Sequence, residues 1–166
     1  MAKTDFTAQR LRDLLHYEPK TGVFTWLVNR QGPARAGDKA GYVRHDKYLI
    51  IGLHGKTYLA HRLAWLYCYG DWPKHDIDHI DGDPSNNSMA NLRDEPTQIN
   101  LQNIKKATKK NLTGLLGVSP SRNKKSWYSR IYIDGQLFCL GTYDSAQDAY
   151  AAYVKAKRAG HIGCTI

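Results

Sequence analysis

Residues 75–100 read HDIDHIDGDPSNNSMANLRDEPTQIN, and this stretch decides how the whole chain is interpreted. It is short of apolar residues and contains five aspartates and four asparagines. Such a segment cannot bury much apolar surface. It is therefore either a disordered loop or a site whose polar groups are present for a chemical reason.

Two neighbouring residues of this stretch, Asp78 and His79, suit phosphodiester hydrolysis. That reaction needs a hard cation at the leaving oxygen and a base that activates water, held in line across phosphorus. A carboxylate is a ligand of Mg²⁺, and a histidine with a pKa of about 6.5 is a base at neutral pH. On an extended segment, consecutive side chains point to opposite sides. Asp78 would then hold the metal while His79 reaches the attacking water.

The residues before this stretch show helical and strand-like patterns in turn. Apolar spacing predicts a helix over residues 6–15 with a threonine cap, and another that starts near Ala60 and ends by Gly70. Branched and aromatic residues predict strands, with His54-Gly55 as a hairpin turn. The predicted strands cover residues 23–27, 42–53 and 56–59.

The C-terminal segment has the clearest local pattern. Residues 127–133 alternate, with Trp127, Ser129, Ile131 and Ile133 on one face, and Asp134-Gly135 predicts a two-residue turn into a strand over 136–140. Ser145 and Asp148 form a capping box that opens a helix through Ala159. We expect a three-stranded antiparallel sheet, with its first strand near 117–119, backed by one helix.

The positive charge of the chain is concentrated towards its C-terminus. The 166 residues carry 24 Lys and Arg against 15 Asp and Glu, a formal net charge of +9. Residues 1–100 contain 13 basic and 12 acidic residues, whereas residues 101–166 contain 11 basic and 3 acidic residues. This excess favours a polyanionic partner, with a solvated surface as the alternative. The three cysteines form no C-x-x-C pair, and no apolar run suits a membrane span, so we expect no disulfide framework, no zinc and no membrane.

The spacing of four residues resembles that of the HNH endonucleases, whose fold is the ββα-metal motif. Asn91 follows Asp78 by thirteen residues, and Asn100 follows it by twenty-two. By this resemblance His79 is the general base, and Asp78 and Asn100 bind the metal. Asn91 braces the loop between the two strands. The flanking residues that are similar to the phage and intron-homing subgroup are 61–64, 80–82, 86–87 and 91–93.

The C-terminal segment resembles the DNA-binding domain of plant ethylene-response-factor (APETALA-type) proteins. This resemblance implies a sheet that lies on duplex DNA. The plant sheet is rich in arginine and tryptophan, whereas Ser119, Leu137 and Cys139 stand at several of those places, so the sequence preference does not carry over. The residues that carry the resemblance are Gly117, Val118, Trp127, Ile131, 140–143 and 146–152.

These observations predict an α+β chain. Residues 1–104 form an N-terminal ββα-metal nuclease domain, residues 105–113 a basic linker, and residues 114–166 the small sheet with its helix. The expected activity is hydrolysis of DNA by a metal-dependent endonuclease with a single Mg²⁺, or Mn²⁺ because oxygen ligands suit both. The alternative is a non-catalytic DNA-binding regulator with a relict nuclease fold. The expected setting is the cytoplasm of a bacterial host, with a phage or mobile element as the source.

Double-stranded DNA is the expected partner, through basic and aromatic side chains. For Arg93, a salt bridge with Asp94 or Glu95 is an equally weighted alternative to a phosphate contact. For the four linker lysines, the alternative is a solvated linker that does not contact DNA. The residues expected to contact DNA are Arg93, Lys105, Lys106, Lys109, Lys110, Arg122, Lys124, Lys125, Tyr128, Arg130 and Tyr132.

Three further polar residues receive structural interpretations. His61 opens a predicted helix, so we expect a structural or capping role for it. Asp81 and Asp83 precede a glycine and a proline, and such pairs favour turns over metal binding.

Overall fold

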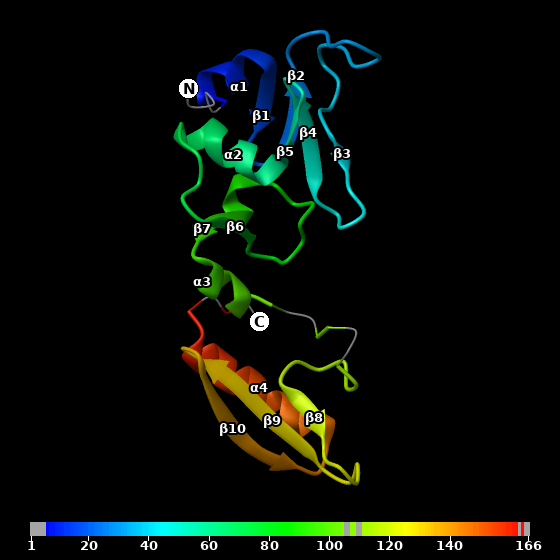
Figure 1. The fold of residues 1–166 in the computed structure, drawn as a ribbon, viewed down its shortest axis with the longest axis vertical. Helices are drawn as coiled ribbons and strands as arrows, with labels where there is room; N and C mark the ends of the chain where they lie inside the picture. The colour runs from blue at the N-terminus through cyan, green and yellow to red at the C-terminus, as the bar shows by residue number, and fades with distance from the viewer. Residues whose placement is uncertain (1–5, 105–106, 109–110, 163, 165–166) are drawn as a thin grey trace. The chain divides into compact units, whose positions relative to one another are not determined.

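The structure is a computed structural model that describes residues 6–104, 107–108, 111–162 and 164. Its contacts divide the chain into two compact units, Met1–Pro96 and Thr97–Ile166. Both units combine helices with antiparallel strands, so the fold is α+β, as predicted (Figure 1). The contact boundary falls earlier than the domain limits expected near 104 and 114, and those limits stay a prediction.

Among the described residues, the first unit contains two α-helices and three small antiparallel sheets. Its elements are α1 (Ala8–Leu14), β1 (Leu15–Glu18), β2 (Val23–Trp26), β3 (Tyr42–Val43), β4 (Leu49–Leu53), β5 (Lys56–Leu59), α2 (Ala60–Tyr69), β6 (Asp76–His79), the 3₁₀ helix η1 (Met89–Asn91) and β7 (Leu92–Glu95). β1 pairs with β2, β4 lies between β3 and β5, and β6 pairs with β7.

Two features of this unit differ from the prediction. The strand expected over residues 42–53 is interrupted by a turn, in which Lys47 has a φ of 70° and Arg44 pairs with Asp46. The strand β1 is absent from the sequence prediction. It follows α1 without an intervening turn because Leu15, the residue after the helix, already has extended backbone angles.

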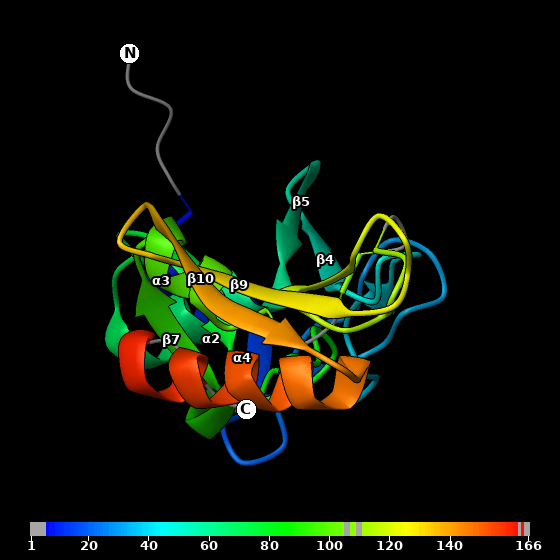
Figure 2. The same ribbon diagram turned by 90° about the horizontal axis from the view of Figure 1, so that it is seen from below.

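The second unit holds a three-stranded antiparallel sheet and the helix that packs on it. Its elements are α3 (Thr97–Gln102), β8 (Val118–Pro120), β9 (Trp127–Ile133), β10 (Gln136–Tyr143) and α4 (Ala146–Gly160). The helix α4 lies along one face of the sheet, and β9 is the central strand (Figure 2). The turn residues Asp134 and Gly135 have φ values of 50° and 79°, and the Ser145 side chain accepts a hydrogen bond from the backbone N–H of Asp148. The predicted turn and cap are thus confirmed.

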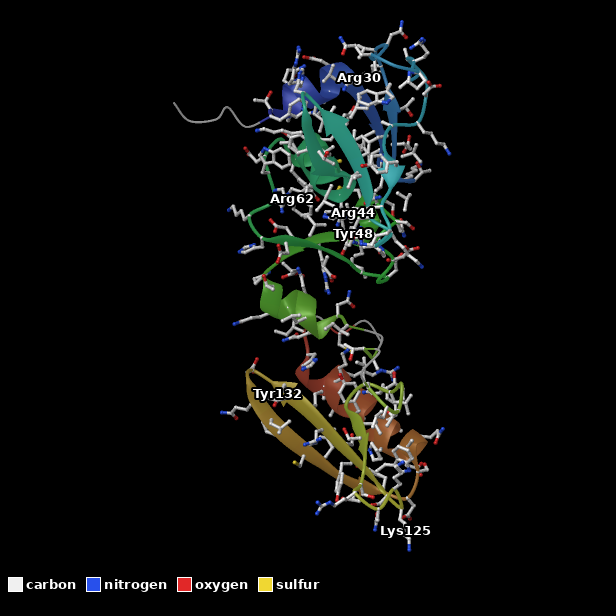
Figure 3. All side chains as sticks on the ribbon, turned by 45° about the vertical axis from the view of Figure 1, so that its right-hand side comes forward. Arg30, Arg44, Tyr48, Arg62, Lys125 and Tyr132 are labelled. Atoms are coloured by element: carbon white, nitrogen blue, oxygen red, sulfur yellow. The ribbon has the colours of Figure 1, made fainter. Side chains whose placement is uncertain are left out.

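The alternation predicted for β9 is also confirmed. Ser129 and Ile131 are buried against α4, whereas Tyr128, Arg130 and Tyr132 are exposed on the other face. Figure 3 labels Tyr132 on this strand and Lys125 on the loop before it. The sheet therefore has one packed face and one face that is open to solvent.

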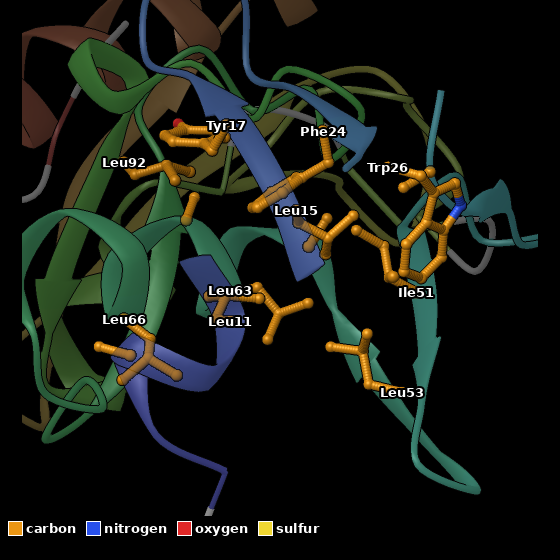
Figure 4. Packing of buried hydrophobic residues seen from close by; sticks show 14 of the residues in the cluster. Leu11, Leu15, Tyr17, Phe24, Trp26, Ile51, Leu53, Leu63, Leu66 and Leu92 are labelled. Carbon is orange, nitrogen blue, oxygen red and sulfur yellow. The ribbon is translucent and has the colours of Figure 1, made fainter. Parts of the chain in front are cut away.

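The core of the first unit joins the N-terminal elements to α2 and β4 (Figure 4). Leu11 from α1, Leu15 from β1, Leu63 from α2 and Ile51 from β4 are all 0% exposed. Burying a side chain of this size contributes about 1.5–3 kcal/mol. The N-terminal residues are therefore an integral part of the core on which the polar stretch after α2 is built.

Candidate active site

Asp78 and His79 lie on β6, whose register with β7 places Asp78 opposite Arg93 and His79 opposite Leu92. Successive side chains of a strand point to opposite faces. The burial of β6 follows this rule, since Ile77 and His79 are buried and Asp78 is half-buried. The segment is extended, as the sequence suggested, and it directs the carboxylate and the imidazole to different faces.

His79 lies in a cluster of aromatic rings. The ring centroid of His61 is 5.0 Å away at an angle of 84°, and that of Tyr48 is 6.0 Å away. Tyr48 ends the β3–β4 turn, beside Arg44, whose backbone N–H donates to the Tyr48 carbonyl (Figure 3). His61 belongs to α2, and the cap residue before that helix is Leu59, so His61 has the expected structural role rather than the capping role.

Burial keeps both histidines of this cluster neutral. His61 and His79 are each 5% exposed. Burial lowers the pKa of His61 to about 3. Burial also lowers the pKa of His79 below its ordinary value, against opposing effects from an Asn87 hydrogen bond and nearby aspartates. At neutral pH the site therefore contains an uncharged imidazole.

Asn87 contacts the His79 ring, a role that the sequence analysis did not assign to it. Its Oδ1 lies 3.4 Å from His79 Nε2, and its Nδ2 donates to the Ser85 carbonyl at 3.1 Å. These two contacts decide which end of the amide faces the histidine. Asn87 is 2% exposed. Nothing local distinguishes it from Asn86, because its contact with His79 depends on the path of the loop.

The site loop, residues 80–91, is closed by Asn91. Its Oδ1 accepts from the backbone N–H of Asp81 at 2.9 Å, and its Nδ2 donates to Asp81 Oδ1 and the Asn86 carbonyl, both at 2.9 Å. Asp81 Oδ1 also accepts from the backbone N–H of Asp83, and Oδ2 accepts from the Asn86 amide. The Asp81 carboxylate is therefore used within the loop, in agreement with the turn expected there.

The N-terminal hairpin holds the site loop from outside. The Tyr17 hydroxyl donates to the Asn87 carbonyl at 2.7 Å, and the backbone N–H of Met89 donates to the Pro19 carbonyl at 2.8 Å. Gly22, with a φ of 73°, approaches so closely that a Cβ there would lie 2.3 Å from the Asn87 carbonyl carbon. The first forty residues, whose role the sequence does not indicate, thus include a brace for the loop beside His79.

Arg93 binds Asp78. Its Nε and Nη2 donate to the same carboxylate oxygen, Oδ2, at 2.9 and 2.7 Å. This partner differs from the Asp94 or Glu95 of the alternative interpretation, because the cross-strand register places Asp78 directly opposite Arg93. This ion pair is partly buried, with side-chain exposures of 22% for Arg93 and 14% for Asp78.

The chemistry of the donor set fits a hard divalent cation. Asp78, on β6 of the first unit, offers a carboxylate, and Asn100, on α3 of the second unit, offers an amide oxygen, each described within its own unit. The chain order β6, β7, α3 is the strand, strand, helix order of the resemblance. Across the part of the chain that is described, no three His, Cys, Asp or Glu residues group as a metal site. A Mg²⁺ ion usually keeps several waters and takes other ligands from substrate phosphate, so a carboxylate and an amide oxygen suit it.

The second unit presents the expected basic and aromatic side chains. Tyr128 and Tyr132 are 43% and 64% exposed, on either side of exposed Arg130. The loop before β9 adds three more exposed cations, and the linker lysines lie outside the described residues. These loop residues are Arg122, Lys124 and Lys125, and the linker residues are Lys105, Lys106, Lys109 and Lys110. Within the described residues, no helix combines the length and apolar character that crossing a bilayer requires.

Comparisons with known proteins found a family model, a curated relative and a solved structure that are similar to this chain. Residues 58–102 match the family model described as HNH endonuclease. Protein 3.8 of Escherichia phage T7 is 36% identical over 77 residues, which cover 46% of this chain and 63%, less than two thirds, of that protein. The structure titled "DNA binding and cleavage by the HNH homing endonuclease I-HmuI" has 24% identity and a TM-score of 0.42, covering 90% of this chain and 88% of the other. Residues 58–102 of this chain are therefore similar to the HNH endonucleases.

Proposed function

We propose that the chain is a metal-dependent endonuclease that hydrolyses DNA, with His79 as general base and with Asp78 and Asn100 as metal ligands. The observation that carries the proposal is the strand β6, which directs Asp78 and His79 to opposite faces. An in-line displacement needs its base and its metal on opposite sides of one phosphorus. All of these residues lie within the segment that matches the HNH endonuclease family.

The contact with Asn87 indicates which nitrogen of His79 acts. Asn87 Oδ1 faces His79 Nε2, and an amide oxygen only accepts hydrogen bonds. Nε2 therefore carries the proton, and Nδ1 is the atom that takes a proton from water. Burial favours the neutral imidazole that a base requires, and the rings of His61 and Tyr48 limit its rotation.

The metal that we propose is Mg²⁺, with Mn²⁺ as a substitute. When bound, such an ion stabilises the negative charge that develops on the leaving oxygen. The chain supplies the carboxylate of Asp78 and the amide oxygen of Asn100 as ligands. Asn91, which ties the two ends of the site loop together, keeps the end of β6 in place.

The second unit is the proposed DNA-binding part. Tyr128, Arg130 and Tyr132 line the open face of its sheet, and the cations of the preceding loop suit phosphate contacts. The sheet-plus-helix architecture agrees with the plant DNA-binding domain that the sequence resembles. Because the T7 relative is a phage protein, we propose that this chain acts on DNA within a bacterial cell, as the product of a phage or mobile element.

The test is plasmid cleavage by His79→Ala, with His16→Ala, at an exposed position of β1, as a matched control. We expect His79→Ala to lose most cleavage and keep DNA binding, while His16→Ala cleaves like the parent. EDTA should abolish cleavage by the parent protein. A His79→Ala rate within about tenfold of the parent, roughly 1.4 kcal/mol in barrier, removes His79 from the base role. Cleavage by neither parent nor variant, with DNA binding intact, would favour the non-catalytic regulator.

A further inference from the structure

One face of the β6–β7 pair gathers charged residues. The register places Asp76 opposite Glu95 and Asp78 opposite Arg93, so these four side chains share a face. Three of them are acids and the fourth is the guanidinium that binds Asp78 Oδ2. Arg93 thus places a cation on the carboxylate that the proposed function assigns to the metal.

We propose that Arg93 is a built-in counter-ion that makes metal binding depend on DNA. It occupies Asp78 in the DNA-free protein and transfers to a DNA phosphate when the duplex binds, which releases the carboxylate for the metal. This inference rests on the proposed function, because it takes Asp78 as a metal ligand. It adds a regulatory role that neither the family match nor the resemblance assigns to Arg93.

The charge balance favours this exchange. A divalent cation placed beside Asp78 while Arg93 remains there is repelled by a positive charge only one hydrogen bond away from the same oxygen. A guanidinium binds a carboxylate or a phosphate with the same pair of parallel donors, so DNA offers Arg93 an equivalent partner. Arg93 is 22% exposed through its side chain, so its guanidinium is accessible to such a ligand.

Cooperativity follows from this exchange. If DNA removes Arg93 from Asp78, then DNA raises the affinity for the metal, and the metal raises the affinity for DNA by the same factor. A lysine at position 93 keeps the charge, whereas glutamine removes it at similar length. The two substitutions therefore separate electrostatic competition from the positioning of the carboxylate.

The experiment measures Mn²⁺ binding to the full chain by calorimetry, first without DNA. We expect Arg93→Gln to bind Mn²⁺ at least about tenfold more tightly than the parent, because the competing cation is gone. Arg93→Lys should bind close to the parent. In the presence of a short duplex, the parent should gain more Mn²⁺ affinity than Arg93→Gln does. Unchanged, weaker or undetectable Mn²⁺ binding by Arg93→Gln without DNA overturns the proposal.

Two controls locate the effect. Arg62→Gln removes a half-buried arginine of the same unit, which donates to the His75 carbonyl, and should leave Mn²⁺ affinity unchanged. Adding Asp78→Asn to Arg93→Gln should abolish the gain in Mn²⁺ affinity. A gain that survives would mean that the ion binds elsewhere, which would contradict both proposals. If Asp78→Asn alone abolishes plasmid cleavage while Arg93→Gln leaves Mn²⁺ affinity unchanged, the nuclease assignment stands and only the counter-ion role falls. Urea unfolding of each variant confirms that it is folded.

Discussion

Replacement of Tyr17 by phenylalanine tests whether the N-terminal hairpin supports the active site. Tyr17 is 1% exposed, and its hydroxyl is the donor to the Asn87 carbonyl at 2.7 Å. The substitution keeps the ring, which packs against Phe24 with centroids 4.6 Å apart. It removes one hydroxyl from a contact that joins residues seventy positions apart in the chain.

The expected cost follows from what the hydroxyl leaves behind. The Asn87 carbonyl is deprived of its Tyr17 donor within a buried environment, and a buried acceptor left unsatisfied costs about 1–3 kcal/mol. In a unit of this size, each kcal/mol lowers the melting temperature by about 4–8 °C. The loop that carries Asn87 also contacts His79, the proposed base, and a small displacement of a catalytic group reduces turnover by up to about a hundredfold.

The assays are thermal unfolding of the full chain and single-turnover cleavage, with exposed Tyr69→Phe as the matched control. We expect Tyr17→Phe to melt at least about 4 °C lower than the parent and to cleave more slowly at saturating DNA. Its affinity for DNA should not change, because the hydroxyl that is removed contacts the Asn87 carbonyl and none of the residues proposed to bind DNA. A Tyr17→Phe protein that matches the parent in both stability and turnover would refute the reasoning.

Three more outcomes are expected. Gly22→Ala should lower the free energy of unfolding in urea more than Gly32→Ala does. Both glycines have positive φ, but only at Gly22 would a Cβ meet the backbone of the site loop. Equal effects would show that the loop moves to accommodate the Cβ. Burial lowers the pKa of His61 in the folded protein to about 3, whereas its pKa in the unfolded chain is about 6.5. The free energy of unfolding should therefore be at its full value above pH 6.5. It should fall by up to about 1.4 kcal/mol per pH unit as the pH drops below 6.5. His61→Phe should flatten that dependence in urea unfolding between about pH 4.5 and 6.5, a range that lies between the folded and unfolded pKa values, and an unchanged slope would assign the dependence to other groups. Replacing Lys124 and Lys125 by alanine should make DNA binding less dependent on salt. The slope of log binding constant against log salt concentration, measured by anisotropy in EDTA, should become shallower by about 0.9 for each phosphate that these lysines neutralise in the parent. An identical slope would exclude such a role for them.

Local signals account for what the sequence predicted well. The Asp134-Gly135 turn and the Ser145 cap are specified by residues within a few positions of one another, and both are present. The strand β1 was missed because no turn residue separates it from α1, and its pairing with β2 depends on the hairpin as a whole. The contact boundary after Pro96 also depends on distant contacts, since Lys157 donates to the Ile104 carbonyl and joins that segment to α4.

The same division between local and distant contacts applies to the site. The adjacency of Asp78 and His79 is visible in the sequence, and so is the spacing to Asn91. The surroundings of His79 are not, because His61 and Asn87 reach it from another helix and from the far side of the loop. The partner of Arg93 was missed for the same reason: strand register, rather than proximity in sequence, brings it to Asp78.

The two-residue arrangement on β6 has a physical advantage that spacing alone does not reveal. A half-buried strand gives neighbouring residues different environments, so His79 is 5% exposed among aromatic rings while Asp78 lies on a face with Asp76, Arg93 and Glu95. Burial keeps the base uncharged, and the charged face can exchange cations. A shift of one residue in register would bury the carboxylate and expose the imidazole, which reverses both effects. The contacts that hold that register, through Asn91 and the N-terminal hairpin, are therefore as much a part of the proposed chemistry as the two side chains themselves.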